Sequence, residues 1–179
     1  MSNHAPSDDK AAAPSTLEAF MSQALAMELE AAQRYSELAD MMEVHNNREV
    51  MELFRKMSVI EGKHARQIMD EMGWKEAPAG ARAPRWQGFE SPETIPGDEA
   101  HYLMTPWHAL ELALAAEQRA EAFFAHLVSV AVAEPVRKAA LELQEEEREH
   151  VELIRAWMSK VPQPAGDWAD DPDPPRYDE

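Results

Sequence analysis

The spacing of apolar residues along the 179-residue chain predicts long helices. In four segments, apolar side chains recur three or four positions apart, the spacing that places them on one face of an α-helix. The alternation of β-branched residues that would indicate a sheet is missing from the sequence. We therefore expect an all-α fold, with helices over about residues 16–44, 46–72, 105–132 and 135–160.

Local signals mark where these helices begin and end. Ser15-x-x-Glu18 has the form of a capping box, in which each side chain bonds the backbone N–H at the other position. Gly73 suits the left-handed conformation that ends many helices. The other helix starts are marked by Asn46-x-x-Glu49, Thr105-Pro106 and Pro135.

A long connection, residues 73–104, joins the first two predicted helices to the last two. Its Pro and Gly residues exclude a long helix, and it is long enough to run from one end of a bundle to the other. Three of its aromatic side chains are expected to pack against the helices, namely Trp74, Trp86 and Phe89. Two helical hairpins joined by one long crossover match a ferritin-like four-helix bundle, and an up-and-down bundle with a long insert is the alternative.

Composition predicts one folded domain between two polar ends. Residues 1–14 are small and polar and are expected to be disordered, residues 15–160 to form the bundle, and residues 161–179 to form an acidic, Pro-rich tail. No apolar run is long enough to predict a membrane span. The N-terminus also has no apolar core of the kind that a signal peptide needs. Together these features predict a cytoplasmic protein.

Charge and cysteine content argue against several classes of function. The formal net charge of -17 at pH 7 argues against a nucleic-acid partner. Since the chain contains no cysteine, we expect no disulfide, no thiolate zinc site and no rubredoxin-type iron centre. Part of the acidity is expected on solvated faces, and part is expected on glutamates that point inward.

The chain carries one pattern of glutamate and histidine twice. A single glutamate is followed by Glu-x-x-His on the next predicted helix, and both parts then recur. A shift of 89 positions lays the first predicted helix on the third, and a shift of 86 lays the second on the fourth. The difference falls in the hairpin turns, where insertions are tolerated. The repeated residues are Glu28, Glu61 and His64 in the first half, and Glu117, Glu147 and His150 in the second.

Helical periodicity places these residues on the side that faces the core. Glu28 lies seven positions before Tyr35, and Glu117 lies seven positions before Phe124. This spacing puts both members of each pair on one helix face. The members of each Glu-x-x-His pair also share a face, among apolar neighbours. One such glutamate alone would more often be a solvated surface residue, but the repeated set favours carboxylates that point into the bundle.

Buried carboxylates need a positive charge beside them. Burial of one unpaired carboxylate costs several kcal/mol, and four of them close together would force some to take up protons. Two divalent cations would balance four negative charges, and neutral histidines would complete the coordination. We therefore predict a two-metal site with the metals about 3.5–4 Å apart. Carboxylate and imidazole ligands suit iron, manganese and zinc.

At these residues the chain resembles the rubrerythrin-like branch of the ferritin-like diiron-carboxylate superfamily, without a rubredoxin domain. The resemblance covers about residues 16–160. It lies in Ala26-Met-Glu28-Leu-Glu-Ala-Ala-Gln-Arg-Tyr35, Glu61-Gly-Lys-His64, Leu114-Ala-Ala-Glu117-Gln-Arg-Ala-Glu-Ala-Phe-Phe124 and Glu145-Glu-Glu147-Arg-Glu-His150. Such proteins use a further glutamate near the third-helix ligand. This chain has Leu114 and Ala120 near that ligand, and Glu121 is either the substitute or a surface residue.

The resemblance implies two iron ions and a role for each repeated residue. The irons would be bridged by two glutamates, and each would also bind one terminal glutamate and one histidine. The implied bridging residues are Glu61 and Glu147, the terminal ones Glu28 and Glu117, and the histidines His64 and His150. Tyr35 is a candidate catalytic residue that hydrogen-bonds a ligand or supplies an electron, and an ordinary core aromatic is the alternative.

The implied function is that of a diiron oxidoreductase that reacts with peroxide or dioxygen. Because the chain lacks rubredoxin cysteines, a separate protein would donate its electrons. Two alternatives remain open: a ferroxidase or iron-storage protein that takes Fe(II), and a non-catalytic helical protein with a structural metal or none. A homodimer is expected, since the long crossover would allow two chains to exchange hairpins.

Overall fold

The computed structural model describes residues 14–82, 91–95 and 99–165, and these residues contain helices and no strand. The all-α prediction is therefore confirmed. Each of the four long helices lies within a few residues of its predicted span, and a four-residue helix is added in the connection. The elements are α1 (Leu17–Val44), α2 (Arg48–Met72), α3 (Ala79–Arg82), α4 (Pro106–Val130) and α5 (Glu134–Met158).

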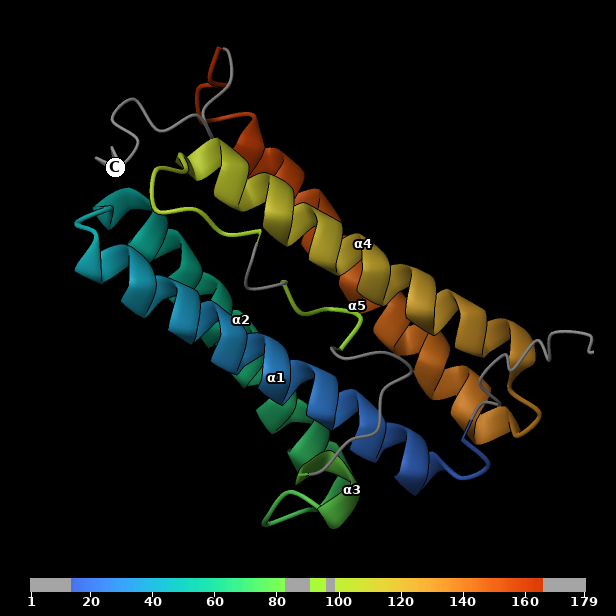
Figure 1. The fold of residues 1–179 in the computed structure, drawn as a ribbon. Helices are drawn as coiled ribbons and strands as arrows, with labels where there is room; N and C mark the ends of the chain where they lie inside the picture. Colours follow the sequence, from blue (N-terminus) through green and yellow to red (C-terminus); the bar gives the residue numbers. More distant parts are fainter. Residues whose placement is uncertain (1–13, 83–90, 96–98, 166–179) are drawn as a thin grey trace, which may run out of the picture.

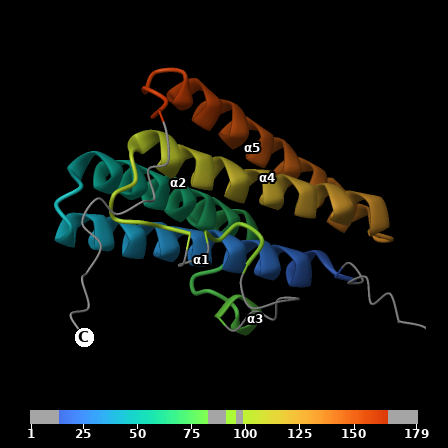
Figure 2. The same ribbon diagram turned by 45° about the horizontal axis from the view of Figure 1, so that its top comes forward.

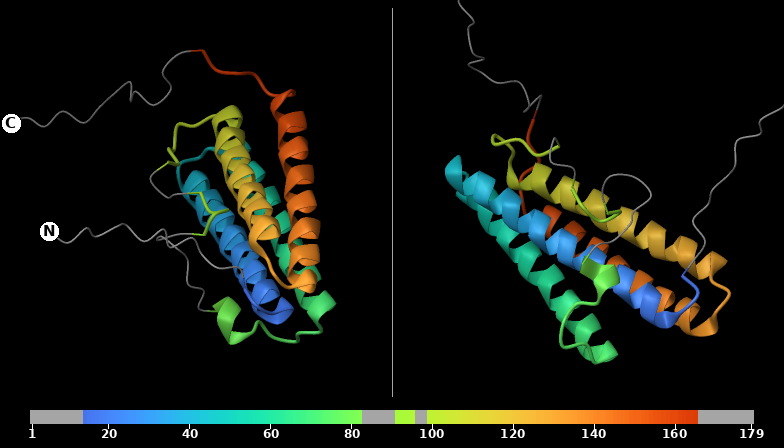
Figure 3. Two further views of the ribbon diagram at one scale, coloured as in Figure 1. Left: turned by 90° about the vertical axis from the view of Figure 1, so that its right-hand side faces the viewer. Right: turned by 60° about the horizontal axis from the view of Figure 1, so that its bottom comes forward.

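The long helices form two hairpins that pack against each other. α1 packs along α2 and α4 packs along α5, so that each hairpin forms one layer (Figures 1 and 2). Between the layers, α2 contacts α4 and α1 contacts α5. The views in Figure 3 show the same two layers from other sides. This arrangement confirms the predicted four-helix bundle of two hairpins.

The connection between the hairpins lies between α1 and α4. Its residues 91–95 and 99–105 run between these two helices as the yellow-green trace in Figure 1. In the described part of the chain, the backbones of α1 and α4 do not approach each other closely. The two helices touch through side chains such as Phe20 and Phe124, whose ring centroids are 6.2 Å apart. Ile95 from the connection is buried in the core. The crossover thus forms one wall of the bundle.

The helix ends follow the predicted signals, with shifts of one residue at the starts of α1 and α2. The N-cap of α2 is Asn47 and not the predicted Asn46, which has a positive φ of 61° in the turn. α1 begins after Thr16, whose hydroxyl accepts a hydrogen bond from the backbone N–H of Ala19 (3.2 Å), so the capping residue is Thr16 and not the predicted Ser15. Gly73 ends α2 with a φ of 66°, as predicted. At the start of α4, the Thr105 N–H donates to His108 Nδ1 (3.1 Å).

The turn between α1 and α2 also holds the end of the crossover. The side-chain amide of Asn47 donates to the carbonyl oxygens of Tyr102 (3.2 Å) and Met104 (2.8 Å). Asn47 is the N-cap residue of α2, but its side chain makes no capping bond to that helix. The crossover is therefore fixed to the first hairpin just before α4 begins.

Two apolar clusters fill the bundle, and a polar layer divides them. One cluster includes Phe20 and Phe124, and the other includes Tyr35 and Phe54. Along every long helix, one buried glutamate lies between residues of the first cluster and residues of the second. The glutamates of the four helices therefore meet at one level, inside an otherwise apolar core.

The predicted tails fall largely outside the described residues. Residues 1–13 and 166–179 are beyond them, so the expectations for both ends stay predictions. In the connection, Trp74 packs against the core as predicted, whereas Trp86 and Phe89 lie outside the described residues. Within the described segments, no helix has both the length and the apolar character needed to cross a membrane.

Candidate metal centre

Each long helix contributes one buried glutamate to the polar layer. The side chains come from α1, α2, α4 and α5, and each residue is at most 1% exposed. Each lies on the apolar stripe of its helix, so burial of the stripe carries the carboxylate inward with it. The structure thus brings together the four predicted glutamates, Glu28, Glu61, Glu117 and Glu147.

In the first hairpin, His64 lies beside both glutamates. Its Nδ1 is 3.7 Å from Glu28 Oε2 and 3.5 Å from Glu61 Oε2. The glutamate and the histidine of α2 are three positions apart, so they lie on one face and reach toward α1 together. The hairpin therefore brings one imidazole and two carboxylates to one place.

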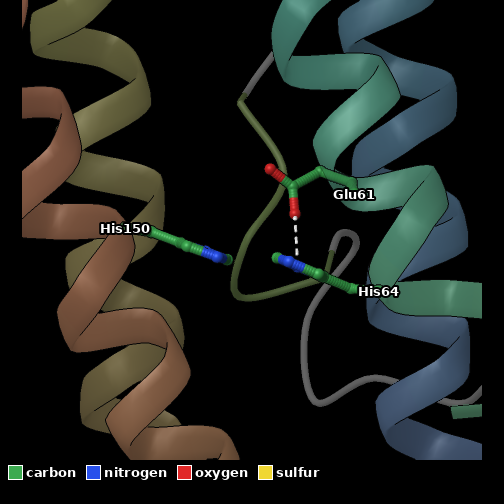
Figure 4. A group of neighbouring side chains, drawn as sticks. All are labelled: Glu61, His64 and His150. Carbon is green, nitrogen blue, oxygen red and sulfur yellow. Dashed lines mark ion pairs between the residues drawn. The ribbon is translucent and has the colours of Figure 1, made fainter. Parts of the chain in front are cut away.

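The second hairpin repeats this arrangement with shorter distances. His150 Nδ1 is 3.2 Å from Glu117 Oε2 and 3.3 Å from Glu147 Oε2. Its ring stacks on that of His64, with centroids 4.5 Å apart and an interplanar angle of 4°. Figure 4 shows these two side chains pointing toward each other from α5 and α2. The two hairpins thus meet at their histidines.

Many polar atoms of this layer have no hydrogen-bond partner among the described residues. They are both carboxylate oxygens of Glu61, one oxygen each of Glu28, Glu117 and Glu147, and Nδ1 of His64. Buried polar atoms in proteins nearly always have a hydrogen-bond partner. A group of buried oxygens without such partners therefore indicates a binding site for a ligand. Because the oxygens belong to carboxylates, a cation is the ligand that fits.

Two groups of these side chains have the spacing of a metal site. Glu61, His64 and His150 offer atoms within 4.8 Å of one another, and so do Glu117, Glu147 and His150. Carboxylate oxygens combined with imidazole nitrogens suit iron, manganese and zinc. The residues present therefore fit a pair of divalent cations.

In the absence of cations, the layer holds extra protons. Burial raises the pKa of Glu61 to about 7, and burial also raises the pKa of Glu147 well above its ordinary value. Burial alone would lower the pKa of a histidine. The neighbouring carboxylates outweigh it and raise the pKa of His64 to about 10 and that of His150 to about 11. Cations that bind here must displace these protons.

A fifth buried glutamate, Glu93, lies in the same layer and is absent from the residues that the repeat predicts. It belongs to the crossover and is fully buried. Burial, followed by the negative charges of the four helix glutamates, raises the pKa of Glu93 well above its ordinary value. The repeat could not reveal it, because the crossover has no second copy, and its Pro-rich sequence has no helical periodicity.

Tyr35 lies beside the layer, in the second apolar cluster. Its ring packs near that of Phe54, with centroids 6.0 Å apart, and its hydroxyl has no hydrogen-bond partner in the described part of the chain. Burial, followed by the charges of Glu117 and Glu61, raises the pKa of Tyr35 well above its ordinary value. The side chain is therefore a neutral phenol that can donate a hydrogen bond.

Glu121, the alternative for a further carboxylate, lies outside the layer. Its Oε1 is 3.4 Å from Nε of Arg148, and it belongs to none of the groups with metal-ligand spacing that the described residues form. The structure thus favours the surface interpretation of Glu121. The further carboxylate in the layer is Glu93.

The chain is similar to known proteins in sequence and in fold. A sequence model of the rubrerythrin family, described as rubrerythrin, matches residues 19–157, a range that contains the whole polar layer. Among solved structures, an uncharacterised conserved protein from Magnetospirillum magnetotacticum MS-1 shares 35% sequence identity, with a TM-score of 0.61. That match covers 85% of this chain and 99% of the other. A comparison with curated proteins finds no match.

Proposed function

The chain belongs to the rubrerythrin family, and from this we propose that it is a diiron-carboxylate oxidoreductase that reacts with peroxide or dioxygen. The family supports a diiron, ferritin-like protein. The observation that carries the proposal is the polar layer, in which two hairpins contribute equal sets of buried carboxylates and histidines with unpaired oxygens. An apolar core would be more stable without these groups unless they bind cations.

Six side chains would hold the iron pair. Four carboxylates carry four negative charges and two Fe(II) ions carry four positive charges, so the filled layer would be neutral. Neutral histidines would complete the coordination of each ion. In this assignment Glu61 and Glu147 would bridge the irons, Glu28 and Glu117 would be terminal ligands, and His64 and His150 would each bind one iron.

The chain's own side chains would supply protons and keep bulk water out. The bound iron pair would supply the two electrons that reduction of a peroxide requires. Tyr35 is a neutral phenol beside the layer, so its hydroxyl can orient a ligand carboxylate or donate a proton. The apolar clusters on both sides of the layer separate it from solvent at the ends of the bundle.

The histidine side of the layer is its most accessible side. The side chains of His64 and His150 are 20% and 12% exposed, whereas the glutamates that contact them are at most 2% exposed. A small oxidant could therefore approach between α2 and α5, away from the crossover that lies between α1 and α4 (Figure 3). Since the chain contains no cysteine, a separate protein would return electrons to the irons.

A ferroxidase or iron-storage function is the second candidate. The net charge of -17 would attract Fe(II) to the protein surface. The same layer could then oxidise Fe(II) as a substrate, and uptake would exceed two irons per chain. A non-catalytic metal-binding protein is the third candidate, and it would hold iron without reacting with an oxidant.

The test compares oxidants on protein that has been loaded anaerobically with Fe(II). We expect faster oxidation with peroxide than with air, followed by repeated peroxide turnover when a chemical electron donor is added. Faster oxidation by air, with iron uptake beyond two per chain, would favour the ferroxidase. Loaded protein that reacts with neither oxidant would contradict both catalytic candidates.

A further inference from the structure

The crossover places a fifth carboxylate among the four from the helices. Glu93 is fully buried, and neither of its carboxylate oxygens has a hydrogen-bond partner within the described segments. Arg119 contacts this segment, but its guanidinium bonds backbone carbonyls and not the carboxylate. A carboxylate buried in this way needs a cation from elsewhere.

Glu93 lies close to all four glutamates of the long helices. It offers an oxygen within 4.8 Å of ligand atoms of Glu28 and Glu147, and likewise of Glu61 and Glu117. In each of these two pairs, one glutamate comes from each hairpin. A carboxylate that reaches both pairs is placed to contact both ions of a two-metal centre. In Figure 4 the yellow-green crossover trace is seen between the two helix pairs, behind the labelled side chains.

Arg119 on α4 holds the backbone that carries this carboxylate. Its Nε donates to the carbonyl oxygen of Pro92 (3.0 Å), and one terminal nitrogen donates to that of Thr94 (3.1 Å). These two residues flank Glu93, so the planar fork of one guanidinium fixes the chain on both sides of it. Arg119 is two positions from Glu117, so one turn of α4 sets the place of both carboxylates.

We infer that Glu93 is a fifth carboxylate ligand of the metal pair and that Arg119 is a positioning residue that presents it. The inference rests on the proposed two-metal centre and makes the crossover part of that centre. With Glu93, five negative charges surround the four positive charges of two divalent ions. Loss of Glu93 therefore weakens cation binding, while the helix ligands remain in place.

Metal affinity tests the role of Glu93 without reference to activity. The full-length chain is titrated with Mn(II) alone in equilibrium dialysis, as wild type and as Glu93→Gln, which keeps the side-chain size and removes the charge. We expect two Mn(II) per wild-type chain, and at least about tenfold weaker binding by Glu93→Gln. The matched control is Glu99→Gln, because Glu99 is exposed on the same connection. Equal affinities of Glu93→Gln and Glu99→Gln would overturn the inference.

A double-mutant cycle tests the role of Arg119. Arg119→Gln should weaken Mn(II) binding about tenfold in the wild-type background. In the Glu93→Gln background it should add little, because no charged carboxylate is left to position. Equal losses in both backgrounds would mean that Arg119 acts on the bundle as a whole, and would overturn its positioning role. Arg66→Gln, an exposed change on α2, is the charge control.

These measurements separate the inference from the proposed centre. A wild-type chain that binds neither Mn(II) nor Fe(II) would overturn both. A wild-type chain that binds two ions, together with a Glu93→Gln chain that matches its control, would overturn the inference alone. Thermal unfolding without metal checks the fold, and Glu93→Gln should be at least as stable as wild type, because glutamine is neutral in the buried layer without taking up a proton.

Discussion

The two hairpins carry the same set of two glutamates and one histidine but differ in the residues around it. His150 lies 3.2 and 3.3 Å from the carboxylate oxygens of its hairpin, whereas His64 lies 3.7 and 3.5 Å from those of its own. Tyr35 in the first half corresponds to Phe124 in the second. In the proposed centre, the repeated residues would give each half one position for a cation. The hydroxyl of Tyr35 has no counterpart in the second half, so it makes one side of the layer chemically different.

The crossover also makes the two halves different, because it has no second copy in the repeat. Arg119, which holds the crossover, corresponds in the first half to Glu30, a residue of opposite charge. The part of the crossover around Glu93 is therefore bonded to α4 of the second hairpin, whereas its end is bonded to Asn47 of the first. The repeat would thus account for the proposed metal binding by both halves, and the unrepeated residues account for what distinguishes one side of the layer.

Replacement of Glu61 and Glu147, the two glutamates proposed to bridge the irons, should disable both halves together and have the largest effect. We expect Glu61→Gln combined with Glu147→Gln to bind no stoichiometric iron, because each residue contacts the histidine of its own hairpin and faces the other hairpin. Metal analysis after anaerobic Fe(II) loading measures the loss. The control is Glu52→Gln combined with Glu142→Gln, two exposed changes on the same helices, which should keep two irons per chain.

Replacement of Tyr35 by phenylalanine should make the two halves alike at the position of the hydroxyl. We expect peroxide-driven oxidation of the loaded iron to slow by about 100-fold if the hydroxyl donates a proton. Stopped-flow absorbance measures the rate. Two irons per chain and unchanged thermal stability would show that the site is intact, and an unchanged rate in that intact variant would make Tyr35 an ordinary core residue.

Replacement of one histidine at a time should show which half contributes more to metal affinity. His64→Ala and His150→Ala should each weaken Mn(II) binding by about tenfold or more. We expect the larger loss for His150→Ala, because His150 lies closer to its carboxylates and is less exposed. Dialysis under identical conditions compares them, and a larger loss for His64→Ala would mean that distances in the metal-free layer do not rank the two positions.

The pH dependence of stability should show the smallest effect, with opposite signs for metal-free and loaded protein. The folded-state pKa of Glu61 is about 7, above its ordinary value of 4.5, so the folded chain binds more protons between these values. The free energy of unfolding of metal-free protein should therefore fall as pH rises from about 4.5 to 7. The histidines act in the same direction above pH 6.5, since their folded-state pKa values are about 10 and 11.

Urea unfolding at several pH values measures this trend. Loaded protein should instead gain stability over the same range, because its ligands must be deprotonated to bind metal. Glu61→Gln should flatten the fall in metal-free protein. A metal-free wild type that grows more stable between pH 4.5 and 7 would contradict the assignment of these protons to the layer.

Residues on periodic helices could be predicted from the sequence, and residues elsewhere could not. The four helix spans and the position of Glu28 follow from helical spacing and from the repeat, because burial of an apolar stripe fixes where every third or fourth side chain points. Glu93 lies in a segment whose path depends on Arg119, a residue of α4 far from it in the sequence. Such tertiary contacts produce no periodic pattern in the amino-acid sequence, so they could not be predicted from it.

The metal content of the full-length protein after anaerobic Fe(II) loading and removal of free iron tests the central claim most directly. The account predicts two irons per wild-type chain and none in the Glu61→Gln and Glu147→Gln double variant, with both proteins folded. A folded wild-type chain that retains no iron would contradict it, and would mean that the repeated glutamates and histidines no longer serve as a metal centre.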